Sequence, residues 1–186
     1  GSSPAISNFI REFFMKSTIK FTLLVFFIFS IFSISLFAQW EVGIEGDLML
    51  IANGDIENSS MLAIAVATSI ADDWSSVYNK YQIAAVVLYS DKIKIKNDYT
   101  LRIKKKSNNY ITYSVTPDDI VEENDSIYIG IGINTKNGVR ANNLIRILLD
   151  SVSVELYDDD DILLGNYNLK GLQEALKENL GDTEWY

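Results

Sequence analysis

The chain of 186 residues contains no histidine and no cysteine, and only two prolines. Without histidine it lacks the commonest general base, the usual zinc ligand and the partner of a serine or cysteine nucleophile. Without cysteine it has no disulfide, no thiol chemistry and no site for lipid attachment of the lipoprotein kind. Catalysis would have to rest on carboxylates, as it does in glycoside hydrolases. We therefore predict a protein that is not an enzyme.

Positive charge is also scarce. The 16 lysines and arginines are outnumbered by 25 aspartates and glutamates, which gives a formal net charge of −9 at pH 7. Proteins that bind nucleic acid use a surplus of basic residues to neutralise phosphates. The composition therefore argues against a nucleic-acid partner.

One long uncharged run stands near the start of the chain. It extends from Phe21 to Ala38, follows Lys16 and Lys20, and ends on a small residue. This is the layout of a signal peptide, with Met15 as the expected first residue and residues 1–14 as an upstream segment outside the fold. The run is also nearly long enough to cross a bilayer, so residues 15–38 are either cleaved after Ala38 or kept as a membrane anchor. Both alternatives predict export to the periplasm, the cell surface or the medium, and the chain contacts the membrane only if this segment is kept.

Residues 39–186 have the length of one domain. Apolar and polar residues alternate with a period of two in several short segments, which turn-forming residues separate, as expected for strands. Short turns between strands favour an all-β, antiparallel β-sandwich of the jelly-roll kind. Leucines at helical spacing predict a closing helix over about residues 168–180, ended by Gly181. The expected strands lie at 42–51, 62–69, 83–89, 99–103, 111–115, 127–133 and 144–156, the last with a bulge near Asp150.

A hairpin is predicted around a three-residue loop at 96–98. In that register Ile93 and Ile95 share a face with Tyr99, and Lys92 lies directly across from Arg102. The opposite face is then basic, and it is either a site for an anionic glycan or lipid phosphate or a solvated face that protects the sheet edge. The residues of this predicted basic face are Lys92, Lys94, Arg102, Lys104 and Lys106.

Three short motifs resemble those of family 4/9-type carbohydrate-binding modules, which are galactose-binding-like jelly-roll sandwiches. Residues 53–57, Asn-Gly-Asp-Ile-Glu, resemble the family's N-G-D-F-E opening. Residues 97–101 resemble its strand entry, and residues 149–154 resemble its late I-D-D-V-S-V strand. The resemblance implies a module that binds polysaccharide or cell-envelope glycan without catalysis. It also implies a structural calcium with Glu57 and Asp150 as ligands.

Sugar rings stack on aromatic side chains that are flanked by hydrogen-bonding groups. Trp74, Tyr78 and Tyr81 are the best candidates, because Trp74 stands among polar turn-forming residues, although burial in the core is an equal alternative for it. Two other classes stay open. The alternation over residues 127–133 also suits a strand of a small outer-membrane barrel, and a structural envelope protein that makes protein contacts fits the same pattern.

Overall fold

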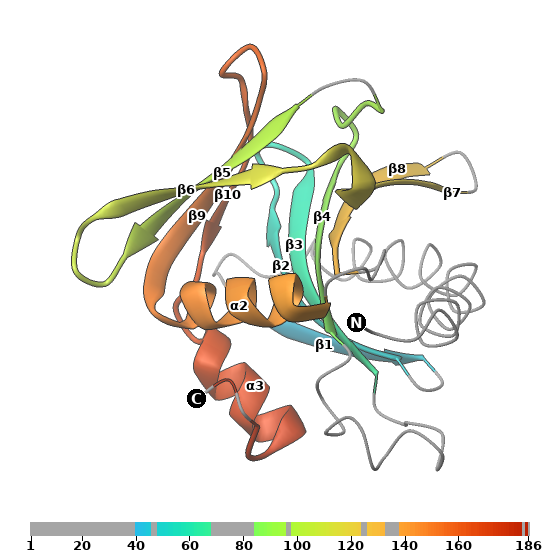
Figure 1. Ribbon diagram of the computed structural model, residues 1–186. Helices are drawn as coiled ribbons and strands as arrows, with labels where there is room; N and C mark the ends of the chain where they lie inside the picture. The colour runs from blue at the N-terminus through green and yellow to red at the C-terminus, as the bar shows by residue number, and fades with distance from the viewer. Residues whose placement is uncertain are drawn as a thin grey trace.

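The computed structural model describes residues 40–45, 48–67, 84–95, 98–123, 126–132, 138–183 and 185. The predicted signal peptide or anchor at 15–38 and the predicted sugar-stacking residues Trp74, Tyr78 and Tyr81 lie outside these ranges. The described residues form two antiparallel sheets that face each other, with two α-helices at one end (Figure 1).

The larger sheet has six strands in the order β1-β2-β3-β4-β8-β7, and every neighbouring pair is antiparallel. Its first four strands follow one another along the chain as a meander. The strands are β1 (Glu41–Glu45), β2 (Leu48–Asp55), β3 (Ser60–Ala67), β4 (Ala84–Ser90), β7 (Ile120–Glu123) and β8 (Ser126–Ile131).

The smaller sheet has four strands in the order β10-β9-β5-β6. They are β5 (Tyr99–Lys105), β6 (Tyr110–Val115), β9 (Ser151–Asp158) and β10 (Leu163–Asn168). A short 3₁₀ helix, η3 (Pro117–Asp119), leads from β6 back to the larger sheet, while α2 (Gly138–Leu149) precedes β9 and α3 (Leu172–Leu180) follows β10.

The core fills the space between the sheets because alternate side chains of each strand point inward. In the smaller sheet the inward residues are apolar and the outward residues are polar, as expected for a sheet with one face in water. Helix α2 lies across one end of this space, between β4 and β9, and buries Leu144, Ile145 and Leu148 in the core (Figure 1). Among the described residues no helix is both long and apolar enough to cross a membrane.

The predicted antiparallel sandwich with a C-terminal helix is confirmed. The single strand predicted at 42–51 is wrong in detail, since β1 and β2 form a hairpin there with Glu45 opposite Leu48. Two strands, β7 and β10, were not predicted from the sequence at all.

The strand predicted from Leu144 to Leu156 is also wrong in its first half. Residues up to Leu149 belong to α2, and β9 begins only at Ser151, so the change of phase near Asp150 is a junction between helix and strand and not a bulge. The buried residues Ala141, Leu144, Ile145 and Leu148 recur at helical spacing, which outweighs the strand preference of the two isoleucines. The Ser151 hydroxyl donates to the Ile147 carbonyl oxygen at 2.5 Å and stabilises this junction.

The C-terminal helix starts later than expected. Asn168 ends β10, and its side-chain oxygen accepts a hydrogen bond from the Lys170 backbone N–H at 2.9 Å, so it forms a local turn and is not the helix cap. Gly171, with φ of +84°, occupies the cap position, and Gly181 ends the helix as predicted. Leu172, Leu176 and Leu180 are buried in the core.

The hairpin predicted around residues 96–98 is not formed. Both edges of β5 are already occupied, by β6 and β9, so residues 91–95 cannot pair with it. The Tyr99 hydroxyl holds this segment instead: it accepts from the Lys94 N–H at 2.6 Å and donates to the Lys94 carbonyl oxygen at 3.0 Å. Arg102 therefore faces Thr112 and Glu155 rather than Lys92.

The two sheets approach each other closely where β10 crosses the end of β2 and β3. Gly165 of β10 has no side chain, and its Cβ position is occupied by two buried hydroxyl groups. A Cβ there would lie 2.2 Å from Tyr167 Oη and 2.5 Å from Ser60 Oγ. Glycine at this position is therefore required by packing.

We expect Gly165→Ala to lower the free energy of unfolding by about 1–3 kcal/mol, because the new methyl group overpacks a closed site. Adding Tyr167→Phe should recover part of the loss, since it removes the closest atom. Urea denaturation of the three proteins measures this. Asn166→Ala is the matched control on an exposed side chain and should change stability by no more than about 0.5 kcal/mol. If Gly165→Ala behaves like this control, the packing argument is wrong.

Candidate functional site

The outward side of the smaller sheet is a polar surface formed by strands, and we call it the polar face. It consists of side chains that alternate with the core residues, so that four strands contribute to one surface. The half-buried Leu163 of β10, which lies opposite Tyr157, borders these polar side chains. The residues of the polar face are Thr100, Arg102 and Lys104 of β5, Tyr110, Thr112 and Ser114 of β6, Ser153, Glu155 and Tyr157 of β9, and Asn166 and Asn168 of β10.

A cluster around Arg102 occupies the middle of the polar face. The guanidinium carbon lies 4.1 Å from the centroid of the Tyr157 ring, and Nη2 lies 2.5 Å from Asp161 Oδ1. The Tyr157 hydroxyl donates to Glu155 Oε2 at 3.2 Å. Burial, reinforced by the Glu155 carboxylate, raises the pKa of the Tyr157 phenol, so it remains a neutral hydroxyl at physiological pH. These contacts hold a planar cation and a ring in a fixed arrangement.

Tyr110 stands at the edge of the same face, on the outermost strand. Its side chain is 63% exposed, and the Lys104 ammonium lies 5.8 Å from the centroid of its ring. Thr112 and Ser114, the next outward residues of β6, are exposed as well. The polar face thus offers one open aromatic ring beside hydroxyl and charged groups, with amide side chains at its far edge on β10.

The predicted basic face is only partly assembled. Arg102 and Lys104 lie side by side on the polar face, but Lys92 and Lys94 are exposed in the connection between β4 and β5. Lys106 follows β5, and its ammonium donates to the Leu149 carbonyl oxygen at 2.7 Å. The positive charge is also offset, because Asp161 pairs with Arg102 and Glu155 lies opposite it.

The predicted calcium ligands are not brought together. Glu57 is exposed in the turn between β2 and β3. The neighbouring Asp55 carboxylate accepts from Asn58 Nδ2 at 2.7 Å and from the Asn166 backbone N–H at 2.8 Å, which places this turn against β10. Asn166 pairs with Glu155 of β9. Glu155 is five residues along the chain from Asp150, a distance of about 16 Å in an extended strand.

Asp150 is engaged elsewhere. Its carboxylate forms an ion pair with the Lys105 ammonium, and this hydrogen-bonded cation lowers the pKa of Asp150. The ion pair joins the end of α2 to the end of β5. Within the described ranges, no three acidic side chains are grouped as a metal ion would require.

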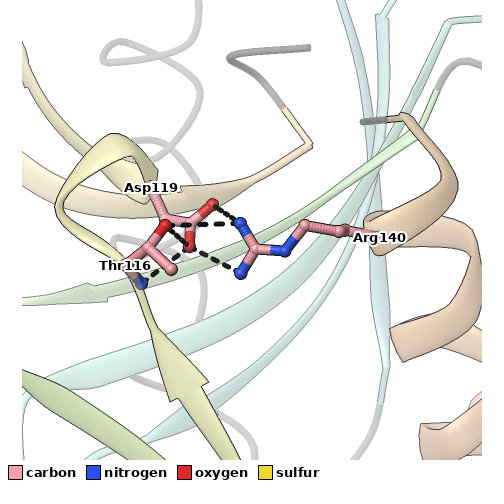
Figure 2. Close-up of polar contacts among 3 residues, drawn as sticks. All are labelled: Thr116, Asp119 and Arg140. Atoms are coloured by element: carbon pink, nitrogen blue, oxygen red, sulfur yellow. Dashed lines mark hydrogen bonds and ion pairs between the residues drawn. The ribbon is translucent and has the colours of Figure 1, made fainter. Parts of the chain in front are cut away.

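A second polar cluster lies inside the fold, where α2 meets the loop after β6 (Figure 2). Arg140 of α2 makes a bidentate contact with Asp119, at 2.9 Å from Nη1 to Oδ1 and 2.9 Å from Nη2 to Oδ2. Asp119 also accepts from the Thr116 backbone N–H at 2.8 Å and from the Thr116 hydroxyl at 2.7 Å. Burial disfavours the charge of Arg140, but the Asp119 contact prevails and raises the pKa of Arg140.

This Asp119–Arg140 pair positions the polar face rather than forming part of it. Thr116 comes directly after β6, and Arg140 belongs to the helix that leads into β9, so the pair ties together the approaches to two strands of the smaller sheet. The Arg140 guanidinium also lies 5.7 Å from the ring of Tyr113, an inward residue of β6. A bidentate pair with a buried carboxylate fixes orientation as well as distance.

Sequence reasoning missed Tyr110 and Tyr157, because an exposed tyrosine and a core tyrosine look alike in an alternating strand. The signal was present in β6: Ile111, Tyr113 and Val115 form the apolar phase, and Tyr110 falls in the opposite, polar phase with Thr112 and Ser114. The pairing of Asp119 with Arg140 has no comparable signal, since the residues are 21 positions apart and meet only in the folded chain.

Comparison with known proteins adds no relative. No protein-family model matches the chain, and neither the curated proteins nor the solved structures contain a significant match. What the observations define is therefore a class: an antiparallel β-sandwich protein with one open, polar sheet face. The resemblance to carbohydrate-binding modules rests on the short motifs alone.

We expect Arg140→Met to lower the free energy of unfolding by about 2–4 kcal/mol, because it leaves the Asp119 carboxylate buried without its cation. Asp119→Asn in the same chain should restore part of that loss by removing the unpaired charge. Urea denaturation measures both. Arg102→Met is the matched control, since it breaks an ion pair exposed at both partners and should cost no more than about 1 kcal/mol. Equal losses for the two arginine variants would contradict a structural role for the Asp119–Arg140 pair.

Proposed function

We propose that this protein is an exported, non-catalytic module that binds polysaccharide on the polar face. The observation that carries the proposal is the exposed Tyr110 ring, which lies beside Lys104 and the hydroxyl side chain of Thr112, with the cluster around Arg102 on the same face. A pyranose ring presents an apolar side and a polar rim, so it needs an aromatic surface and several hydrogen-bonding groups together.

The chemistry of the face supports binding rather than turnover. Two of its charged side chains have partners there: Arg102 pairs with Asp161, and Glu155 accepts a hydrogen bond from the Tyr157 hydroxyl. Side chains held by such partners present a constant pattern of donors and acceptors, which suits a ligand that is bound and released unchanged. The net negative charge of the chain is consistent with a neutral glycan as the ligand.

The proposal places sugar stacking on Tyr110, while the sequence alone pointed to Trp74, Tyr78 and Tyr81. A sandwich sheet face gives a ligand a rigid support, because its backbone is fixed by hydrogen bonds on both sides of each inner strand. The edge strand β6 leaves Tyr110 accessible from two directions.

We expect Tyr110→Ala to abolish retention of the exported protein in affinity gels that contain β-glucan, xylan or mannan, whichever retains the parent. Its melting temperature should change by less than about 3 °C, because the side chain is mostly in water. Ile44→Ala is the matched control: this residue is also exposed, at 62%, but belongs to β1 of the other sheet, and its loss should leave retention unchanged. If neither variant alters retention on a gel that binds the parent, the polar face is not the binding site.

A further inference from the structure

Each of the two described sheets has two edge strands, whose outer backbone groups can pair with a further strand. In the larger sheet the edge strands are β1 and β7, and each carries two glutamates within a short sequence. Charged residues on an edge strand oppose pairing with another strand. The glutamates are Glu41 and Glu45 of β1, and Glu122 and Glu123 of β7.

In the smaller sheet the edge strand β10 is held by the larger sheet. Its Asn166 N–H donates to the Asp55 carboxylate at 2.8 Å, and its Asn168 carbonyl oxygen accepts from Asn53 Nδ2 at 2.8 Å. These are backbone groups on the side of β10 away from β9, so an added strand would have to displace both bonds. The edge at β10 is therefore occupied.

The remaining edge strand, β6, has neither kind of protection. Its sequence contains no charged residue, no glycine and no proline, and all but one of its residues are β-branched or aromatic. Such a segment has a strong preference for pairing with another strand. No described strand pairs with the side of β6 away from β5, and the turn of the β5–β6 hairpin points away from the larger sheet (Figure 1).

The backbone groups on the unpaired side of β6 follow from its pairing with β5. The Lys105 N–H donates to the Asn109 carbonyl oxygen at 2.8 Å, so this pair, next to the first pair of the ladder, is a hydrogen-bonded one. Hydrogen-bonded and non-hydrogen-bonded pairs alternate along an antiparallel ladder. Every second residue from Tyr110 to Ser114 therefore directs its N–H and C=O groups away from β5, and Thr112 lies at the centre of this set.

This strand is complementary to a second copy of itself. When two β6 strands run antiparallel about an axis at Thr112, Thr112 pairs with Thr112, and Tyr110 pairs with Ser114 on each side of the axis. Each of these three pairs can exchange two hydrogen bonds, so all the outward-directed groups of the set find partners. A register shifted toward the end of β6 would need the Thr116 N–H, which already donates to Asp119.

The side chains fit the same register. On the core side Ile111 lies opposite Tyr113 of the second copy, and in one copy each of these apolar side chains is only partly buried at the border of the core. Pairing of the strands would cover both of them. On the polar side a threonine meets a threonine, which is a favourable pair, and no like charges lie opposite each other.

We propose that two copies of the protein associate through β6, antiparallel and about a two-fold axis at Thr112. The two smaller sheets then form one sheet, and the two polar faces form one surface on which Ser114 of the second copy lies beside Tyr110. A two-fold contact uses the same strand in both copies, so the assembly closes at a dimer. The association does not depend on the proposed function, because it requires no ligand.

The chain has no cysteine, so introduced thiols report on this contact without background. We expect Thr112→Cys, in the protein recovered after export, to form a disulfide-linked dimer on mild oxidation, because the two Cα atoms face each other at about 5.5 Å. Ser114→Cys is the matched control, exposed on the same side of the same strand. Its counterpart lies four residues along the partner strand, or about 13 Å away, so it should give about tenfold less linked dimer.

Sedimentation over a range of concentrations measures the same association without thiols. We expect the parent to pass from monomer to dimer, and Thr112→Lys to dimerise at least tenfold more weakly, because two ammonium groups meet at the axis. Asn166→Lys adds the same charge on β10 and should leave the dimer intact. Thr112→Pro removes an outward N–H and no bond to β5, and it replaces Thr112→Lys if that variant fails to fold by circular dichroism.

Equal cross-linking of Thr112→Cys and Ser114→Cys would overturn the proposal, since it would reflect random collision. A parent that stays monomeric at every concentration would exclude a second copy as the partner of β6. A dimer that survives both substitutions of Thr112, by lysine and by proline, would place the contact on another surface. Growth of the parent into species larger than a dimer would contradict the closed two-fold pairing.

Discussion

Burial of the central strands β2, β3 and β4 determines where the other elements of the fold pack. Their side chains are apolar in both phases, so these strands carry little of the alternation that marks a half-exposed sheet. Burying a single aliphatic side chain contributes about 1.5–3 kcal/mol, so these strands contribute strongly to the stability of the described fold. The smaller sheet, α2 and α3 then add a second layer on one side, and the outward surface of the smaller sheet is polar.

Polar groups beside this apolar layer would be costly if they had no hydrogen-bond partner. A few long-range hydrogen bonds provide partners for them. Asn53 Nδ2 donates to the Asn168 carbonyl oxygen at 2.8 Å, and Trp40 Nε1 donates to the Lys170 carbonyl oxygen at 3.1 Å. With the Asp55 contact to the Asn166 N–H, these bonds join the open edge of the smaller sheet to the meander of the larger one. A buried polar group is costly unless it is paired, so these residues specify the relative position of the sheets.

How far the sequence predicts this structure depends on how local the deciding interaction is. The strands β5, β6 and β8 follow from period-two alternation, and Gly181 ends α3 because a helix commonly ends on glycine in the left-handed region. The secondary structure of residues 144–149 cannot be decided from local pattern. Ile145 and Ile147 suit a strand, while Leu144, Ile145 and Leu148 suit a helix. Packing between β4 and β9 decides in favour of α2, and that is a property of the folded chain. The same holds for Lys92, whose predicted partner Arg102 is taken by strands far away in the sequence.

The candidate site shows the corresponding limit for function. Its residues come from four strands that span positions 100–168, and their meeting depends on the order β10-β9-β5-β6, which no local pattern encodes. In the motif at 53–57, Asp55 makes hydrogen bonds to Asn58 and to the Asn166 backbone N–H, and the second of these holds β10. β10 in turn pairs with β9, which supplies Glu155 and Tyr157 of the polar face. The motif that suggested a ligand site in the sequence thus helps to position the smaller sheet, on whose polar face we place the site.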